Sequence, residues 1–189
     1  KDLIDEFISY VNKNDFSLNS TIEKSIFETN SFLMKNNPTL IEYAAFFGSA
    51  QIFNYLYKND VKMASSLWIY SIHSNNPEMI HLLEENKVEP KDKSYFECYR
   101  ESIKCHHNDM ARYIENNFFK RNIKNINFEK HYRDNIISYG FKYYNFLSLP
   151  KEFDYKYIIY YASEFDYFKL VNMLINTKEI NINASIDNI

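Results

Sequence analysis

Residues 52–56 read Ile52-Phe53-Asn54-Tyr55-Leu56, and their apolar order returns along the chain. Four further blocks are apolar at the first, second, fourth and fifth positions: Met79-Ile80-His81-Leu82-Leu83, Met110-Ala111-Arg112-Tyr113-Ile114, Tyr143-Tyr144-Asn145-Phe146-Leu147 and Leu170-Val171-Asn172-Met173-Leu174. The last residues of the five blocks are 27, 31, 33 and 27 positions apart. Self-similarity at a period of about 30 residues is typical of stacked repeat proteins. Because these positions share one helical face, each block predicts an amphipathic helix.

A second short pattern precedes three of these blocks. It reads Leu40-Ile41-x-Tyr43-Ala44, Leu67-Trp68-x-Tyr70-Ser71 and Ile158-Ile159-x-Tyr161-Ala162, with a partial copy in Cys98-Tyr99-x-x-Ser102. Its last residue is always small, which allows a neighbouring helix to approach closely. Each unit is therefore predicted to be helix, tight turn, helix, and the chain to be all-α.

Between the two helices of a unit lie residues that tolerate a left-handed backbone: Gly48, Asn75, His106 and Asp166. The fourth unit fits least well. Its second helix is predicted from Phe141 to Leu147, and its first must be assembled from residues off the pattern, namely Phe128, Tyr132, Ile136 and Ile137.

Helix starts are indicated by capping chemistry. Ser94 with Glu97 and Ser20 with Glu23 have the spacing of capping boxes. Asn76-Pro77-Glu78 combines a cap, a proline at the first helical position and an acid beside the positive helix end. Residues 1–35 are predicted to be a helical N-terminal cap, with Ile22, Ile26 and Phe27 in one apolar stripe.

Composition excludes several classes of protein. Apolar residues make up 46% of the chain and aromatic residues 18%. A core of this composition can be stable without disulfides or metals. Only two glycines argue against phosphate-binding loops and hairpin-rich β folds. A net charge of −3 gives no general attraction to nucleic acid or anionic membranes.

No apolar run reaches the length of a membrane span, and no stretch of the given sequence has the pattern of a signal peptide. Two cysteines are too few for a disulfide framework, which favours a reducing compartment inside the cell. We expect an intracellular protein, in the cytoplasm rather than the nucleus. No small-molecule substrate, cofactor or membrane partner is expected.

The stretch Leu40-Ile41-Glu42-Tyr43-Ala44-Ala45-Phe46-Phe47-Gly48, followed by Ile52 to Leu56, resembles the ankyrin repeat. Residues 41–118 look closest to a divergent ankyrin-like domain of unknown function found in trichomonad protists. The usual threonine-proline-leucine-histidine start is reduced to Thr39-Leu40-Ile41-Glu42, and the 27-residue spacings leave shortened inter-repeat loops. The resemblance implies a concave protein-binding surface, with no catalysis and no cofactor.

The predicted organisation is an ankyrin-like solenoid. An N-terminal cap at 1–35 precedes five degenerate repeats at about 38–64, 65–92, 93–122, 123–153 and 154–183. Because 181–189 resembles the start of a further repeat, we expect the parent protein to continue past Ile189.

The predicted function is a non-enzymatic interaction with an unidentified protein. The resemblance places the variable end of each first helix in the concave groove. The candidate contact residues are Phe46, Phe47, His73, Ser74, Lys104, Cys105, Glu164 and Phe165. Phe46 and Phe47 together predict an exposed apolar pair, unless one packs against the adjacent repeat. Trp68 is expected in the core, and His73, His81 and His131 on solvated helix surfaces.

Two other functions remain open. Cys98, Cys105, His106 and His107 form the one ligand-like cluster in the sequence and could serve a metal-binding or enzymatic protein. We prefer packing and turn chemistry for these residues and predict no metal site and no catalytic residue. The segment Lys120 to Arg133 is basic, with Phe128 and Tyr132 interleaved, and could bind nucleic acid weakly. A solvated charged face is the preferred interpretation there.

Overall fold

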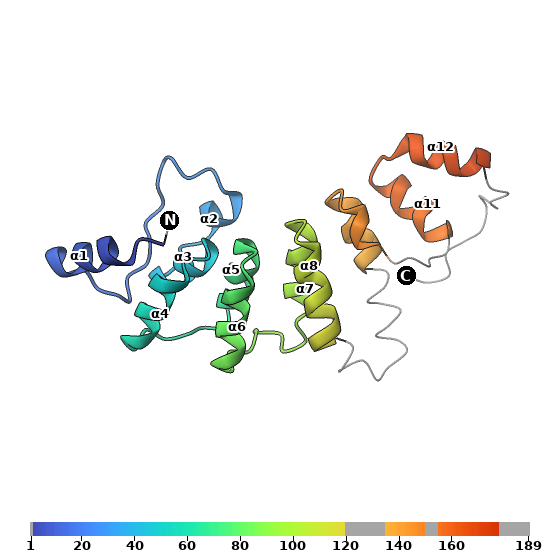
Figure 1. The fold of residues 1–189 in the computed structure, drawn as a ribbon. Helices are drawn as coiled ribbons and strands as arrows, with labels where there is room; N and C mark the ends of the chain where they lie inside the picture. The colour runs from blue at the N-terminus through green and yellow to red at the C-terminus, as the bar shows by residue number, and fades with distance from the viewer. Residues whose placement is uncertain (1, 120–134, 150–154, 178–189) are drawn as a thin grey trace. The chain divides into compact units, whose positions relative to one another are not determined.

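The computed structural model describes residues 2–119, 135–149 and 155–177, and its regular elements are helices (Figure 1). Within these ranges the β structure is limited to one isolated antiparallel bridge between Thr21 and Thr39. The all-α class predicted from the sequence is confirmed for the described residues. The chain divides into two compact units, Lys1–Glu101 and Ser102–Ile189, which are described separately.

The first unit contains α1 (Ile4–Asn14), α2 (Ser31–Lys35), α3 (Leu40–Phe46), α4 (Ala50–Lys58), α5 (Leu67–Ser74), α6 (Pro77–Glu85) and most of α7 (Phe96–Lys104). Helices α3 and α4 form one hairpin and α5 and α6 another, and the two first helices, α3 and α5, pack side by side (Figure 1). The first unit therefore repeats one motif, as the sequence pattern predicts.

Side-chain caps fix the starts of α3 and α6. A capping box opens α3, because Thr39 Oγ1 accepts from the Glu42 amide and a Glu42 carboxylate oxygen accepts from the Thr39 amide. At α6 the Asn76 side chain accepts from the Glu78 amide, and Pro77 needs no acceptor at the first helical position. The predicted start of α6 is confirmed.

The core of the first unit is apolar and aromatic. Its largest fully buried side chain is Trp68, whose Nε1–H donates to the Val88 carbonyl at 2.7 Å. The Tyr95 ring meets the indole edge-on at a centroid distance of 4.9 Å. The core location predicted for Trp68 is confirmed. Other buried side chains include Ile41, Phe53, Leu56, Leu67, Ile72, Met79, Ile80 and Leu83.

The N-terminal region differs from its prediction between α1 and α2. Residues 15–30 are not helical, so the Ser20–Glu23 capping box is wrong. The Ser20 carbonyl instead accepts from the Leu40 amide, and the Ile22 amide donates to the Pro38 carbonyl. Extended pairing with the entry to α3 satisfies these backbone groups. It leaves two residues of the expected stripe in solvent, with Ile26 92% and Phe27 85% exposed, while Ile22 is half-buried.

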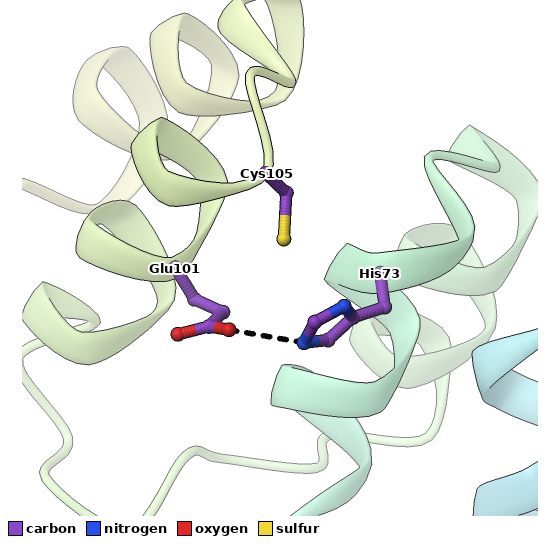
Figure 2. Close-up of side chains that lie close together, drawn as sticks. All are labelled: His73, Glu101 and Cys105. Carbon is purple, nitrogen blue, oxygen red and sulfur yellow. Dashed lines mark ion pairs between the residues drawn. The ribbon is translucent and has the colours of Figure 1, made fainter. Parts of the chain in front are cut away.

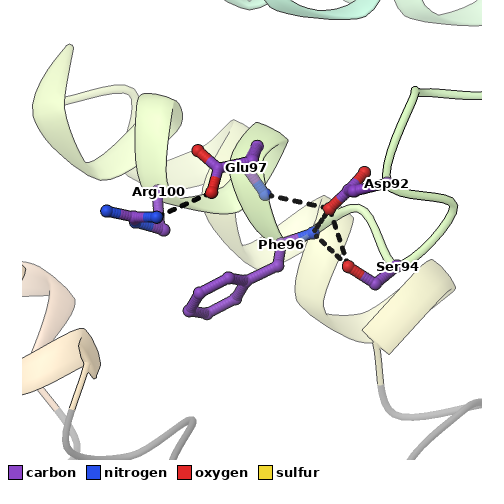
Figure 3. Close-up of polar contacts among 5 residues, drawn as sticks. All are labelled: Asp92, Ser94, Phe96, Glu97 and Arg100. Atoms are coloured by element: carbon purple, nitrogen blue, oxygen red, sulfur yellow. Dashed lines mark hydrogen bonds and ion pairs between the residues drawn. The ribbon is translucent and has the colours of Figure 1, made fainter.

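The start of α7 also differs from its prediction (Figure 3). The carboxylate of Asp92 accepts from the amides of Phe96 and Glu97, at 3.0 and 3.3 Å. The Glu97 side chain turns away and pairs with Arg100 at 2.6 Å. The capping box of Ser94 and Glu97 is therefore wrong, since an upstream carboxylate supplies the charge-assisted cap.

The second unit contains α8 (Asn108–Ile114), η1 (Glu115–Phe119), a helix over 135–142, the 3-10 turn η2 (Phe146–Ser148), α11 (Tyr155–Glu164) and α12 (Phe168–Thr177). Helices α11 and α12 pack as a hairpin. One core cluster joins them to the helix over 135–142, through Ile137, Phe141, Ile158, Tyr161, Ala162 and Leu174.

The fourth pair corrects the sequence interpretation. Helix 135–142 ends before Tyr144, which has a left-handed φ of 59°, so a second helix from Phe141 to Leu147 is wrong. The block at 143–147 is a turn followed by η2. Its first helix is in fact on the pattern, as Ile136-Ile137-x-Tyr139-Gly140. Phe128 and Tyr132, which were expected to contribute, lie outside the described residues.

Candidate protein-binding surface at the inter-helix turns

Five inter-helix turns share one backbone conformation. A left-handed residue lies four positions after a small one in each, with φ of 64° at Gly48, 50° at Asn75, 60° at His106, 59° at Tyr144 and 61° at Asp166. The four turn residues predicted from the sequence are confirmed, and Tyr144 is a fifth. The small residues are Ala44, Ser71, Ser102, Gly140 and Ala162.

The residue after the left-handed position closes four of these turns. Its amide donates to the carbonyl of the small residue five positions earlier: Ser49 to Ala44, His107 to Ser102, Asn145 to Gly140 and Tyr167 to Ala162, over 2.7–2.9 Å. A left-handed residue followed by this bond is how helices commonly satisfy their last carbonyls.

At three turns the residue that follows the left-handed position also donates a side-chain hydrogen bond to the preceding helix pair. Asn76 Nδ2 donates to the Gly48 carbonyl at 3.1 Å. Asn145 Nδ2 donates to the Ile103 carbonyl at 2.8 Å, and the Tyr167 hydroxyl donates to the Phe141 carbonyl, also at 2.8 Å. These bonds tie neighbouring turns together within each compact unit.

The two phenylalanines before the first turn have opposite environments. Phe46 is buried, with its ring 6.0 Å from that of Phe32 and 5.0 Å from that of His73. Phe47 is 55% exposed and rests against Tyr43 at 4.8 Å. An exposed pair is therefore wrong, because Phe46 fills the space between α2 and α5. Phe47 alone offers an apolar surface.

His73 is a packing residue rather than a surface contact. Its side chain is only 10% exposed, and Nε2 lies 3.0 Å from Glu101 Oε1 on α7 (Figure 2). The Phe32 ring packs against the imidazole, with the two ring centroids 4.2 Å apart. The solvated surface predicted for His73 is wrong, whereas His81 is exposed, as predicted. His131 lies outside the described residues.

Ser74 belongs to the turn itself. Its hydroxyl donates to the Ser71 carbonyl at 2.6 Å and accepts from the Asn76 amide at 3.1 Å. Its hydrogen-bonding capacity is thus used within the fold, and the side chain is half-buried.

The remaining candidates differ in exposure. Lys104 and Cys105, at the end of α7, are half-buried, and Cys105, also drawn in Figure 2, is described with the second unit. Glu164 is exposed at the end of α11, whereas Phe165 packs against the core cluster of the second unit. Of the eight predicted contact residues, Phe47 and Glu164 are exposed in their own units.

The four residues of the ligand-like cluster have different environments. Cys98 is fully buried in the first unit, and burial, with help from the charge of Asp92, raises the pKa of its thiol. A thiol held in its neutral form is a poor metal ligand, because the thiolate is the species that binds metal. In the second unit, His106 Nε2 lies 2.8 Å from the Tyr143 carbonyl, and Cys105 and His107 are half-buried.

The basic segment from Lys120 to Arg133 lies outside the described residues. The prediction of a nucleic-acid contact there remains a prediction.

Two structural residues were missed from the sequence. Asn145 is buried, and its amide joins Ile103 to Asn108 Oδ1, at 2.8 and 2.9 Å. Gly140 occupies the small position of the fourth pair. The signal for both was present, because Tyr139-Gly140 continues the first-helix pattern, but the competing apolar block at 143–147 obscured it.

Comparison with known proteins gives no relative: no family model, no curated protein and no solved structure matches the chain. None of the described helices is long and apolar enough to cross a membrane.

Proposed function

We propose that this chain is an ankyrin-like repeat protein, a solenoid of helical hairpins that binds another protein and catalyses no reaction. The observation that carries the proposal is the recurring turn, with a left-handed residue four positions after a small one at five places. Stacked repeats of this kind provide an extended, preorganised surface, which lowers the entropic cost of binding.

The stacking part of the proposal is supported inside the first unit. Glu42, which forms the capping box of α3 with Thr39, accepts a hydrogen bond from the Ser66 hydroxyl at the start of α5. At the other end of the same helices, Asn76 donates to the Gly48 carbonyl. Both ends of neighbouring first helices are thus joined by polar contacts, with apolar packing between them. This geometry favours a row of hairpins over a single central core.

The binding part of the proposal centres on Phe47. It ends α3 beside the Gly48 turn and is exposed, although its neighbours Phe46 and His73 are packed. An exposed aromatic ring on a rigid turn loses little conformational freedom on binding, so it suits the centre of an interface. In the proposed solenoid this end of the first helices faces the concave groove.

The test is affinity capture from the source cell with three forms of the chain: wild type, Phe47→Ala and Tyr57→Ala. Tyr57 is an exposed aromatic residue on α4, so it serves as a matched control away from the turn. We expect proteins that wild type and Tyr57→Ala retain, and that Phe47→Ala binds about thirtyfold more weakly, the size of a hot-spot residue.

Binding affinities of the retained proteins are then measured by titration. Equal loss with Phe47→Ala and Tyr57→Ala contradicts a specific turn surface. Equal retention by all three forms contradicts the role of Phe47. Circular dichroism of each variant confirms that the fold is intact.

A further inference from the structure

Helix α4 is capped by a residue far away in the sequence. Its own N-cap residue, Ser49, makes no side-chain capping bond. The carboxylate of Asp2 accepts instead from the amides of Gln51 and Ile52, at 2.7 and 3.1 Å. A carboxylate at this place satisfies two orphan amides and interacts favourably with the helix dipole.

Helix α1 follows Asp2 and lies against α4 (Figure 1). The Phe7 ring meets the Tyr55 ring edge-on, with centroids 6.0 Å apart and planes at 82°. The acid at the helix start and the aromatic ring one turn into α1 together define a docking pattern: a carboxylate five residues before an aromatic side chain.

Helix α1 buries fewer side chains than helices α3 to α6 do. Val11 is the one buried residue along α1, and Leu3 and Tyr10 have large exposed apolar surfaces. Helix α5 is shorter than α1 but buries Leu67, Trp68, Tyr70, Ser71 and Ile72. Segments that bury few apolar side chains have low free energies of local unfolding, so they open more often than the core does.

We propose that the face of α4 is an exchangeable docking site, which residues 2–11 occupy in the resting protein. The partner that fits it is an amphipathic helix with a carboxylate five residues before an aromatic side chain, because that chemistry reproduces the contacts of Asp2 and Phe7. Such a partner competes with a tethered segment at high effective concentration, so it must bind more tightly than α1 does. This inference is independent of the turn surface at Phe47.

Hydrogen exchange of the full chain, measured by mass spectrometry with fragmentation to single amides, tests the docking. We expect α1 to exchange much faster than α5 in the wild type. Asp2→Ala should accelerate exchange at Gln51 and Ile52 about tenfold, the size of a lost helix cap, and leave α5 unchanged. Glu6→Ala, which alters an exposed acid in the first turn of α1, is the matched control and should leave Gln51 and Ile52 unchanged. Protection of α1 equal to that of α5, or no effect of Asp2→Ala, overturns the proposal.

Displacement of α1 is tested with a labelled peptide of residues 1–16 and the Asp2→Ala/Phe7→Ala variant of the full chain, whose α4 sequence is unchanged. We expect this variant to bind the peptide at least tenfold more tightly than wild type does, and the peptide to lose that affinity when it carries Asp2→Ala. No binding to the variant, or equal binding of both peptides, overturns the proposal. Neither result alters the expectation for Phe47→Ala in the capture experiment, so the two proposals fail separately.

Discussion

The α5–α6 hairpin and the pair formed by helix 135–142 and η2 start from the same pattern and end differently. Both first helices have two apolar residues, a tyrosine and a small residue, as Leu67-Trp68-x-Tyr70-Ser71 and Ile136-Ile137-x-Tyr139-Gly140. In both, a left-handed residue follows and then an asparagine that donates to an earlier backbone carbonyl. The two pairs are therefore the same up to the turn.

They differ in what the asparagine does next. Asn76 also accepts from the Glu78 amide, and the nine-residue helix α6 follows. Asn145 makes no capping bond, and its Nδ2 group donates to the Ile103 carbonyl and to Asn108 Oδ1. Only the three-residue η2 follows, and Leu149 is extended, with ψ of 141°. Leu149 precedes Pro150 in the sequence, and a proline disfavours the helical conformation of the residue before it.

The difference teaches that the common unit is the first helix with its turn. Whether a full second helix follows depends on the residues after the turn: Pro77 begins α6, whereas Leu149, before Pro150, ends η2. Substitutions in the two pairs test this view, since matched changes should have unequal costs.

The largest effect is expected from removing the centre of the better-formed pair. Trp68→Ala should lower the free energy of unfolding by about 3–5 kcal/mol, because it leaves a cavity and orphans the Val88 carbonyl. Urea denaturation followed by circular dichroism measures it. Phe146→Ala in η2, a half-exposed aromatic residue, should cost less than about 1 kcal/mol. Equal costs would mean that η2 is as structural as α5.

The two turn asparagines provide the next comparison. Asn145→Asp should cost about 2–3 kcal/mol, because it buries a carboxylate beside the carbonyl oxygen of Ile103 and loses both donated bonds. Asn76→Asp should cost less than about 1 kcal/mol, since the carboxylate still caps α6 and its gain from the helix dipole offsets the lost bond to the Gly48 carbonyl.

Thermal and urea unfolding of the two Asp variants, with Asn76→Ala and Asn145→Ala beside them, measures these costs. A larger loss for Asn76→Asp than for Asn145→Asp contradicts the distinct roles of the two side chains. The Ala variants separate loss of a hydrogen bond from burial of a charge.

The helices and turns of the repeats could largely be predicted from the sequence. Apolar spacing and small residues indicated α3 to α6, and the four turn residues Gly48, Asn75, His106 and Asp166 have the left-handed backbone predicted for them. These predictions succeed because local periodicity and backbone tolerance are properties of short segments.

Other features depend on long-range contacts that a short pattern cannot reveal. The apolar stripe of Ile26 and Phe27 suggested a helix, but extended pairing between residues 20–22 and 38–40 takes the backbone instead. His73 lies on a helical surface by its position, yet Phe32, Phe46 and Glu101 from three other elements enclose it. The exposure of the candidate contact residues was therefore predicted less well than the positions of the helices.

The smallest effects concern the small position of the two first helices. An added Cβ at Gly140 would lie 2.7 Å from the Leu149 Cδ2, 3.2 Å from the Asn145 carbonyl oxygen and 3.3 Å from the Ser148 Oγ. Gly140→Ala should therefore cost about 1–2 kcal/mol, although alanine favours a helix. At the equivalent Ser71, Oγ is buried and makes no hydrogen bond to the part of the chain that the structure describes. Ser71→Ala should be neutral or stabilise by up to about 1 kcal/mol, since it removes an unsatisfied polar group. Urea unfolding of both variants measures the difference, and a stabilising Gly140→Ala would show that η2 does not crowd the first helix.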